Sequence, residues 1–238
     1  MSHFEHYFQY IIPTGSEKLD LYFEGGLKTG SIVGLVGQTN SGLSTFAKSF
    51  AMNALRSKDK QDRSLNLKVL HIDLENHGYS SYIASLLNVK QSDSLDSQLN
   101  AVQSFKEQFE HRFKFVHNIL TLNSLPVELH DIYSKFRFNV VVIDYPQLFV
   151  DFVDLQKTLS EIKSIATKFD CLIFCPIIIN RNNASRVYTL SNIFCDIIME
   201  TKFEQGGLVS LTVLKKYRVK DNIKFSFVPD FESKSWIK

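Results

Sequence analysis

The chain contains few cysteines, little net charge and no long apolar run, and each shortage excludes a class of protein. The three cysteines, Cys171, Cys175 and Cys195, do not have the spacing of a metal site, and each stands in an apolar run. We therefore expect buried thiols in a reducing, intracellular compartment. The net charge of +2 is too small to indicate nucleic-acid binding by itself, although local basic loops can still contact DNA or RNA. The apolar runs are too short to cross a membrane, and we expect no signal peptide.

Hydrophobic residues make up 44% of the 238 residues, which is enough to bury one core of the larger α/β kind. Buried-strand patterns alternate with segments in which apolar residues recur at helical spacing, as in Phe46, Phe50 and Ala54. Such alternation predicts an α/β fold with a mainly parallel central sheet and helices on both faces. The last third changes character, because strand-like runs at 193–200, 208–214 and 224–228 predict an antiparallel C-terminal edge.

The first ten residues are aromatic, with Phe4, Tyr7, Phe8 and Tyr10 close together. They stand outside the α/β pattern, and they form either a strand that completes the core or an arm that docks on a partner. The strand is the plainer interpretation. We therefore divide the chain into an aromatic N-terminal arm or strand, 1–10, and one core domain, 11–238.

A glycine-rich turn between a strand-like run and a helix-like run organises the chain. Residues 37–45, GQTNSGLST, have the spacing of the phosphate-binding loop G-x-x-x-x-G-K-[ST], but Leu43 stands where the lysine belongs. In a working loop, backbone N–H groups cradle the phosphates, the lysine reaches the β and γ oxygens, and the hydroxyl holds magnesium. The sequence therefore predicts a degenerate nucleotide loop formed by Gly37, Asn40, Ser41, Gly42, Leu43, Ser44 and Thr45.

Strand ends should surround that loop, because ligands of such sheets sit outside the carboxyl ends of the strands. Asp144 ends the apolar run 140–143 and has the place of an acid that orients magnesium, with a turn cap as the alternative. Glu75 follows the strand 67–73 and is placed to activate a water, or equally to begin a helix as a solvated carboxylate. We interpret Glu75 and Asp144 as vestigial catalytic residues, and Ser44 and Asp144 as vestigial metal ligands.

A further strand end, Phe174 to Ile179, offers no polar group beyond a thiol. A hydrolytic site needs positive charge and a polar contact on the transferred phosphoryl group, and both are missing here. The sequence therefore argues against efficient ATP hydrolysis. We expect no bound cofactor, with weak binding of ATP and Mg²⁺ as the alternative.

Two basic clusters are candidate contacts for nucleic acid. Arg181 and Arg186 lie in the predicted loop 180–188 and could touch phosphates, although a solvated connection is the plainer interpretation. Lys216 and Arg218 belong to a second cluster on or after a strand. That cluster could serve as an arginine finger for a neighbouring subunit or as a DNA-facing edge, and a protected edge strand is the plain alternative.

The segments Thr14 to Asp20 and Glu24 to Ile32 resemble, nearly residue for residue, the stretch ahead of the phosphate loop in the eukaryotic RecA-type strand-exchange recombinases. The run 69–75 is similar to that family's second core strand, with Glu75 at its catalytic glutamate. The run 141–144 is similar to its Walker B strand. The chain thus resembles a paralogue of these recombinases with a degenerate Walker A motif, which implies a RecA-like P-loop core.

The departures from the family pattern concern the phosphate site and the DNA-binding loops. Leu43 replaces the loop lysine, and Ile177 falls where the family has its γ-phosphate-sensing glutamine. The first DNA-binding loop shrinks to about 149–153, and the second to about 180–191. We expect no separate N-terminal helical domain and no Phe-x-x-Ala segment of the kind these recombinases use to polymerise.

The resemblance implies a non-catalytic accessory paralogue, or mediator, that acts in a heteromeric complex and helps the RecA-type recombinase on single-stranded DNA in homologous recombination repair. Its implied partners are another recombinase paralogue and the recombinase itself, with DNA contacted through the complex and no membrane involved. The resemblance also implies a nuclear location. Two rivals stay open: a DnaB-type hexameric helicase-like core, which Asp144-Tyr145 and Lys216-Tyr217-Arg218 fit, and a purely structural subunit without DNA contact.

Overall fold

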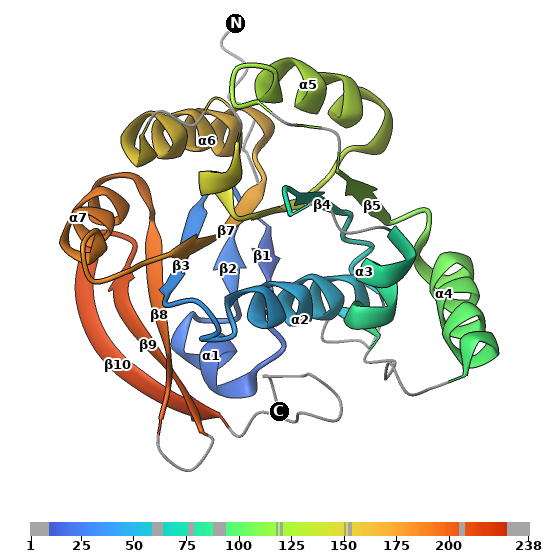
Figure 1. Ribbon diagram of the computed structural model, residues 1–238, viewed down its shortest axis with the longest axis horizontal. Helices are drawn as coiled ribbons and strands as arrows, with labels where there is room; N and C mark the ends of the chain where they lie inside the picture. The colour runs from blue at the N-terminus through green and yellow to red at the C-terminus, as the bar shows by residue number, and fades with distance from the viewer. Residues whose placement is uncertain are drawn as a thin grey trace, which may run out of the picture.

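A computed structural model describes residues 10–58, 64–75, 79–87, 94–117, 119, 121–149, 151, 154–204 and 208–227. Within them an eight-stranded sheet has the order β10-β9-β8-β3-β7-β6-β4-β5, and β1 and β2 form a separate antiparallel pair (Figure 1). The strands are β1 (Ile11–Ile12), β2 (Leu27–Lys28), β3 (Ile32–Gly37), β4 (Val69–Asp73), β5 (Phe113–Val116), β6 (Val140–Asp144), β7 (Leu172–Ile178), β8 (Ile197–Phe203), β9 (Val209–Lys216) and β10 (Val219–Phe227).

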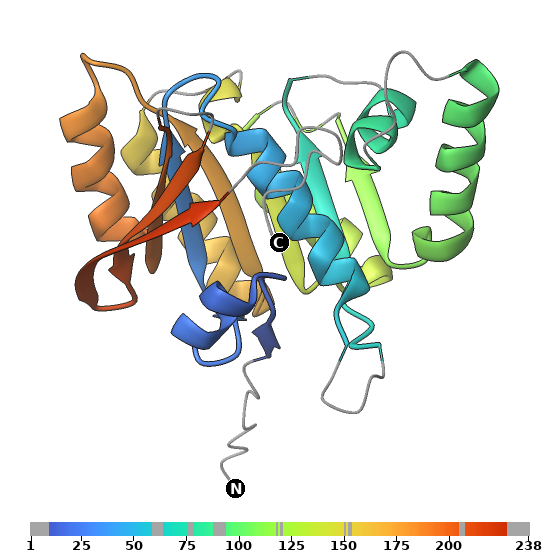
Figure 2. The same cartoon turned by 90° about the horizontal axis from the view of Figure 1, so that it is seen from below.

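Helices cover both faces of the large sheet (Figures 1 and 2). They are α1 (Glu17–Tyr22), α2 (Leu43–Arg56), α3 (Tyr79–Leu86), α4 (Leu95–Phe109), α5 (Leu125–Phe136), the 3₁₀ turn η1 (Pro146–Leu148), α6 (Leu155–Phe169) and α7 (Ala184–Phe194). None of the helices described is long and apolar enough to cross a membrane.

The predicted sheet is confirmed. Strands β8, β3, β7, β6, β4 and β5 run parallel, and β9 and β10 add an antiparallel edge next to β8. This is the architecture that the resemblance to the RecA-type recombinases implies. The carboxyl ends of the parallel strands lie at one edge, which therefore is where a site should form.

The sheet separates two apolar layers. The first lies under α1 to α4, where the rings of Phe46 and Phe50 in α2 stack on Phe174 of β7 at centroid distances of 5.9 and 4.9 Å. The second lies under α5, α6 and α7 and includes Leu159 and Ile162 of α6. Because the parallel strands are buried on both faces, their residues read as continuous apolar runs rather than as alternating patterns.

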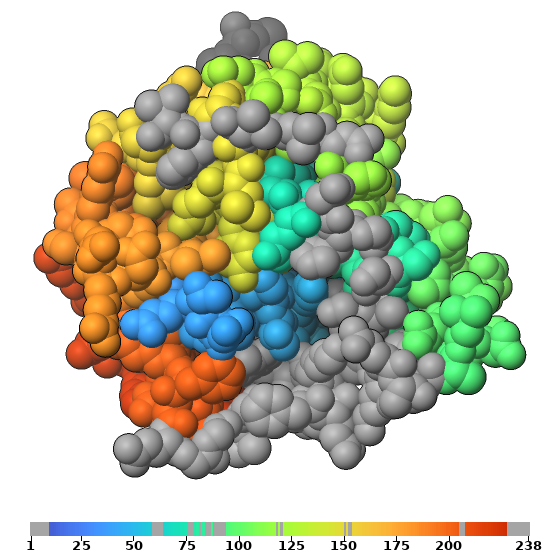
Figure 3. All heavy atoms as spheres, viewed as in Figure 1, coloured from blue at the N-terminus to red at the C-terminus, as the bar shows by residue number. Residues whose placement is uncertain are grey.

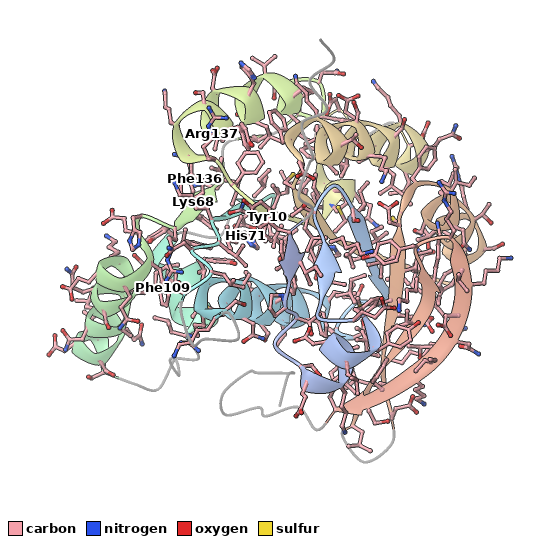
Figure 4. All side chains as sticks on the ribbon, turned by 180° about the vertical axis from the view of Figure 1, so that it is seen from behind. Tyr10, Lys68, His71, Phe109, Phe136 and Arg137 are labelled. Carbon is pink, nitrogen blue, oxygen red and sulfur yellow. The ribbon has the colours of Figure 1, made fainter. Side chains whose placement is uncertain are left out.

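Aromatic contacts tie β4 and β5 to the helices that flank them. His71, labelled in Figure 4, is fully buried on β4, and its Nδ1 lies 2.8 Å from Tyr82 Oη of α3. Its ring also stacks on Phe115 of β5. At the amino end of β4, Lys68 Nζ lies 5.4 Å from the ring centroid of Phe136. His71 is thus a core residue and not a candidate ligand of a bound group.

Three boundaries differ from the prediction. Residues 193 and 194 close α7 instead of opening a strand, so that β8 begins at Ile197. The stretch predicted as the loop 180–191 is mostly helix, because Val187 and Leu190 form a buried stripe at helical spacing. Strand β10 begins at Val219 rather than at 224. The predicted N-terminal arm or strand, apart from Tyr10, and part of the predicted loop 149–153 lie outside the described residues.

Candidate functional site

The candidate nucleotide loop joins the carboxyl end of β3 to the first turn of α2. Its backbone is left-handed at Asn40 (φ 65°) and at Gly42 (φ 86°). A Cβ on Gly37 would lie 2.3 Å from Ser41 Oγ and 2.5 Å from Thr201 Oγ1, so glycine is required there. In the space-filling view, the blue surface before α2 adjoins the yellow surface of the segment after β6 (Figure 3).

Ser41 joins the loop to the neighbouring strand. Its Oγ lies 3.0 Å from Thr201 Oγ1 of β8, and both residues are buried. The hydroxyl that the loop offers at this position therefore already has a partner inside the protein.

Leu43, at the lysine position, points into the core. Its side chain is only 2% exposed and belongs to the apolar layer under α2. The position therefore brings no positive charge to the loop. The residues present do not fit the hydrolysis of Mg²⁺-ATP, because no cation at this position would reach the β and γ phosphates.

Ser44, which the sequence predicts as a vestigial metal ligand, contacts two residues at the end of β6. Its Oγ lies 2.6 Å from Tyr145 Oη and donates to Asp144 Oδ1 at 3.3 Å. The structure thus brings the predicted pair Ser44 and Asp144 together, and Tyr145 joins them. Thr45, next along α2, is partly buried.

Asp144 lies in an unusual electrostatic environment. Burial raises its pKa to about 7, against the lowering effect of the Lys48 ammonium on α2 and of the hydrogen bond from Ser44. The Glu75 and Asp73 carboxylates add to the rise. Burial thus disfavours the charged form of the Asp144 carboxyl group.

Of the two other predicted positions, Glu75 lies close enough for its carboxylate to act on Asp144, whereas Ile177 lies apart from the loop. Glu75 is exposed after β4, and its backbone N–H donates to Asp73 Oδ1 at 3.1 Å. Ile177 is fully buried in the layer under α5 to α7, on the face of the sheet opposite α2. Its neighbour Ile178 packs on the α2 side instead. Neither isoleucine offers a polar group to a phosphate.

The predicted DNA-contact residues fall into two places. Arg181 is exposed in the turn 180–183, and Arg186 is exposed in the first turn of α7. Arg218 is exposed at the turn between β9 and β10. Lys216 is different, because its Nζ donates to Tyr22 O at 2.8 Å and to Glu24 Oε1 at 3.1 Å, at the end of α1. The side chains of Arg181, Arg186 and Arg218 are thus exposed to solvent, whereas Lys216 is hydrogen-bonded to the end of α1.

Sequence reasoning missed the contacts of Tyr145, Lys48 and Thr201. Tyr145 directly follows the predicted acid, and Lys48 follows Ser44 by one turn of helix, so both lay near a recognised motif. Thr201 carries no such signal, because it meets Ser41 only through the pairing of β8 with β3.

The comparisons with known proteins agree with this geometry. The family model for Rad51 matches residues 9–190. Among solved structures, the chain is similar to an ATPase domain, with a TM-score of 0.74 and 15% sequence identity, covering 95% of this chain and 90% of that one. At that identity the similarity shows the fold alone. No curated protein sequence matches the chain significantly.

Proposed function

Because the chain belongs to the Rad51 family, we propose that it is a non-catalytic accessory subunit of RecA-type recombination. In this proposal it acts in a heteromeric complex with another recombinase paralogue, and the complex helps the RecA-type recombinase on single-stranded DNA. The setting is homologous recombination repair in the nucleus. Membership of the family accounts for the RecA-like core. The residues of the degenerate loop are the reason to distinguish this chain from an active recombinase.

The observation that carries the proposal is the burial of Leu43. An active loop places a lysine ammonium on the phosphates, whereas here an apolar side chain, 2% exposed, is part of the core. The hydroxyl of Ser44 contacts Tyr145 and Asp144, which supports a structural use of the loop. Neither isoleucine at the end of β7 replaces the missing polar contact.

DNA contact in this proposal falls to exposed arginines. Arg181, Arg186 and Arg218 have exposed side chains and no ion-pair partner among the described residues. Guanidinium groups in that state are suited to backbone phosphates. Arg181 and Arg186 stand at the carboxyl edge of the sheet, next to the end of β7.

Two measurements test the proposal. Affinity capture of the tagged chain from its native cell, with mass spectrometry, should recover a RecA-type recombinase and a second paralogue. ATP turnover of the captured complex should not change when Glu75→Gln or Asp144→Asn is introduced. A clear loss of turnover with either variant would overturn the non-catalytic assignment.

A purely structural subunit without DNA contact is the second candidate. The engagement of Lys216 with α1 favours it, because this lysine serves the fold rather than a phosphate. In a DnaB-type hexamer the finger would be Arg218, whose side chain is exposed. Salt-dependent binding of single-stranded DNA that weakens in an Arg181→Ala, Arg186→Ala double variant would exclude the structural candidate.

A further inference from the structure

Two buried carboxyl groups lie side by side at the candidate site. Asp73 ends β4 and Asp144 ends β6, and the two residues are register partners in these adjacent parallel strands. Each residue is only 1% exposed. Carboxylates that share a buried place repel each other and lose their hydration, so they require a cation nearby. In P-loop ATPases the magnesium ion of the bound nucleotide supplies positive charge at an acid of this kind.

Both carboxyl groups face the side of the sheet that α2 covers. Ser44 of α2 donates a hydrogen bond to Asp144 Oδ1 at 3.3 Å. Burial raises the pKa of Tyr82 on α3, and the carboxylates of Asp144 and Asp73 raise it further, so both groups lie near this tyrosine. Helix α2 packs on β4, β6 and α3 (Figure 1). A side chain of α2 can therefore reach the ends of both strands.

Lys48 brings positive charge to this place from α2. It follows Ser44 by four residues, so the two side chains share a face of the helix, and helical side chains lean toward the amino end. Its Nζ lies 5.1 Å from the ring centroid of Tyr82, and the residue is only partly exposed. Burial raises the pKa of Asp144, and of the charged groups that act on it Lys48 has the largest effect, which lowers that pKa. The ammonium group therefore lies close to the carboxyl groups at the ends of β4 and β6.

We propose that the Lys48 ammonium takes the place of a bound metal ion and serves as the permanent counter-ion of Asp144 and Asp73. The chain lacks a cation at the loop position, Leu43, from which an ammonium would reach phosphate, but it has one beside the acids that a metal ion would bind. A divalent ion at Asp144 would meet the like charge of Lys48, so this lysine also opposes the binding of Mg²⁺. The core thus needs no nucleotide to neutralise its strand ends. Neither a partner nor DNA enters this role of Lys48, so its failure would leave the proposed function intact.

A double-mutant cycle tests the role of Lys48 as a counter-ion. Melting temperatures are compared for the full unchanged chain, Lys48→Met, Asp144→Asn and the double variant at pH 8, which lies above the pKa of about 7 of Asp144. Lys48→Met should lower the melting temperature by about 4–8 °C, because it leaves the buried carboxyl groups without their counter-ion. Next to Asp144→Asn the same change should lower it by no more than about half as much. Equal losses in both backgrounds would overturn the inference, because Lys48 would then act only through its packing on Tyr82.

A magnesium titration at the same pH tests whether the ammonium stands where a metal ion would bind. Raising Mg²⁺ from zero to about 10 mM should shift the melting temperature of the unchanged chain by less than about 1 °C. Lys48→Met should gain about 3–6 °C, because the uncovered carboxylates bind the ion in the folded chain only. The double variant of Lys48→Met and Asp144→Asn should not gain. Failure of Lys48→Met to gain, or an equal gain by the unchanged chain, would overturn the inference.

Two further variants serve as controls. Lys106→Met removes another ammonium that lies over a tyrosine of α3, 5.6 Å from the ring centroid of Tyr79, but from α4 rather than from α2. It should lose the same stability with and without Asp144→Asn, and it should not respond to Mg²⁺. Lys48→Arg keeps the positive charge and should behave like the unchanged chain in the magnesium titration, whereas a gain equal to that of Lys48→Met would contradict the role of the charge. Should Lys48→Met not fold, Lys48→Gln takes its place in both measurements.

Discussion

The hydroxyl oxygens of Ser44 and Tyr145 lie 2.6 Å apart, although the two residues are 101 positions apart in the chain. Ser44 lies in the first turn of α2, and Tyr145 follows β6, so the contact joins this turn to the strand that ends in Asp144. A hydroxyl that would hold magnesium in an active site is used here inside the protein. These contacts therefore attach the first turn of α2 to the end of β6.

Removing the hydroxyl of Tyr145 should weaken the attachment of α2 to β6. We expect Tyr145→Phe to lower the free energy of unfolding by about 0.5–1.5 kcal/mol, because one partly buried hydrogen bond is lost. Urea unfolding at neutral pH measures this change in the free energy of unfolding. Tyr10→Phe, at a tyrosine that is 59% exposed, is the control and should have no effect. Equal stability of Tyr145→Phe and the unchanged chain would show that the contact does not hold the loop.

Restoring the loop lysine should not restore catalysis. Leu43→Lys puts an ammonium at a position that is 2% exposed, so we expect a loss of at least about 2 kcal/mol in unfolding free energy. ATP turnover should stay at background, because the polar contact at the end of β7 is still missing. Leu21→Lys, at an 82% exposed leucine, is the matched control and should be neutral. Turnover by the Leu43→Lys chain would mean that the site is far less decayed than its geometry indicates.

Much of the fold could be predicted because its signals are local. Runs such as Val140 to Asp144 are buried on both faces, and they read directly as parallel strands. The boundary of α7 could not be predicted as well, because Ile193 and Phe194 are apolar and continue into the run before β8. Apolar residues at the junction of a helix and a strand satisfy both patterns at once.

In the candidate site, too, some residues could be predicted from the sequence and others could not. Ser44 and Asp144 could be predicted because motif spacing places both at the carboxyl edge of a parallel sheet. The burial of Leu43 and the use of Lys216 at α1 could not, because each depends on packing between distant segments. The face of the sheet on which Ile177 lies could not be predicted either, since a shift of one residue along a strand changes the face.

Because the pKa of Asp144 is raised, its deprotonation should make the free energy of unfolding fall as pH rises. Its pKa is about 7 in the folded chain against 3.8 as the ordinary value, so the folded state binds more protons between these limits. Unfolding free energy should therefore decrease through this window, and the penalty is complete above pH 7. Relative to the unchanged chain, Asp144→Asn should gain about 2–3 kcal/mol between pH 5 and pH 8, measured by urea unfolding. Asp96→Asn, at an exposed carboxylate of α4, is the control. Parallel pH profiles for Asp144→Asn and the unchanged chain would contradict the assignment.

Substitution of Lys216 should affect stability and not DNA binding, whereas substitution of Arg218 should do the reverse. Lys216 Nζ donates to the Tyr22 carbonyl and lies 4.8 Å from the Tyr22 ring centroid, so Lys216→Met should lower unfolding free energy by about 1 kcal/mol. Its affinity for single-stranded DNA should not change. Arg218→Met should leave stability unchanged, because the side chain is exposed, and should reduce the salt slope of DNA binding by about 0.7. Salt titrations of both variants make the comparison. If Lys216→Met instead weakens DNA binding and leaves stability intact, this lysine faces a phosphate, and its contact with α1 is not its main use.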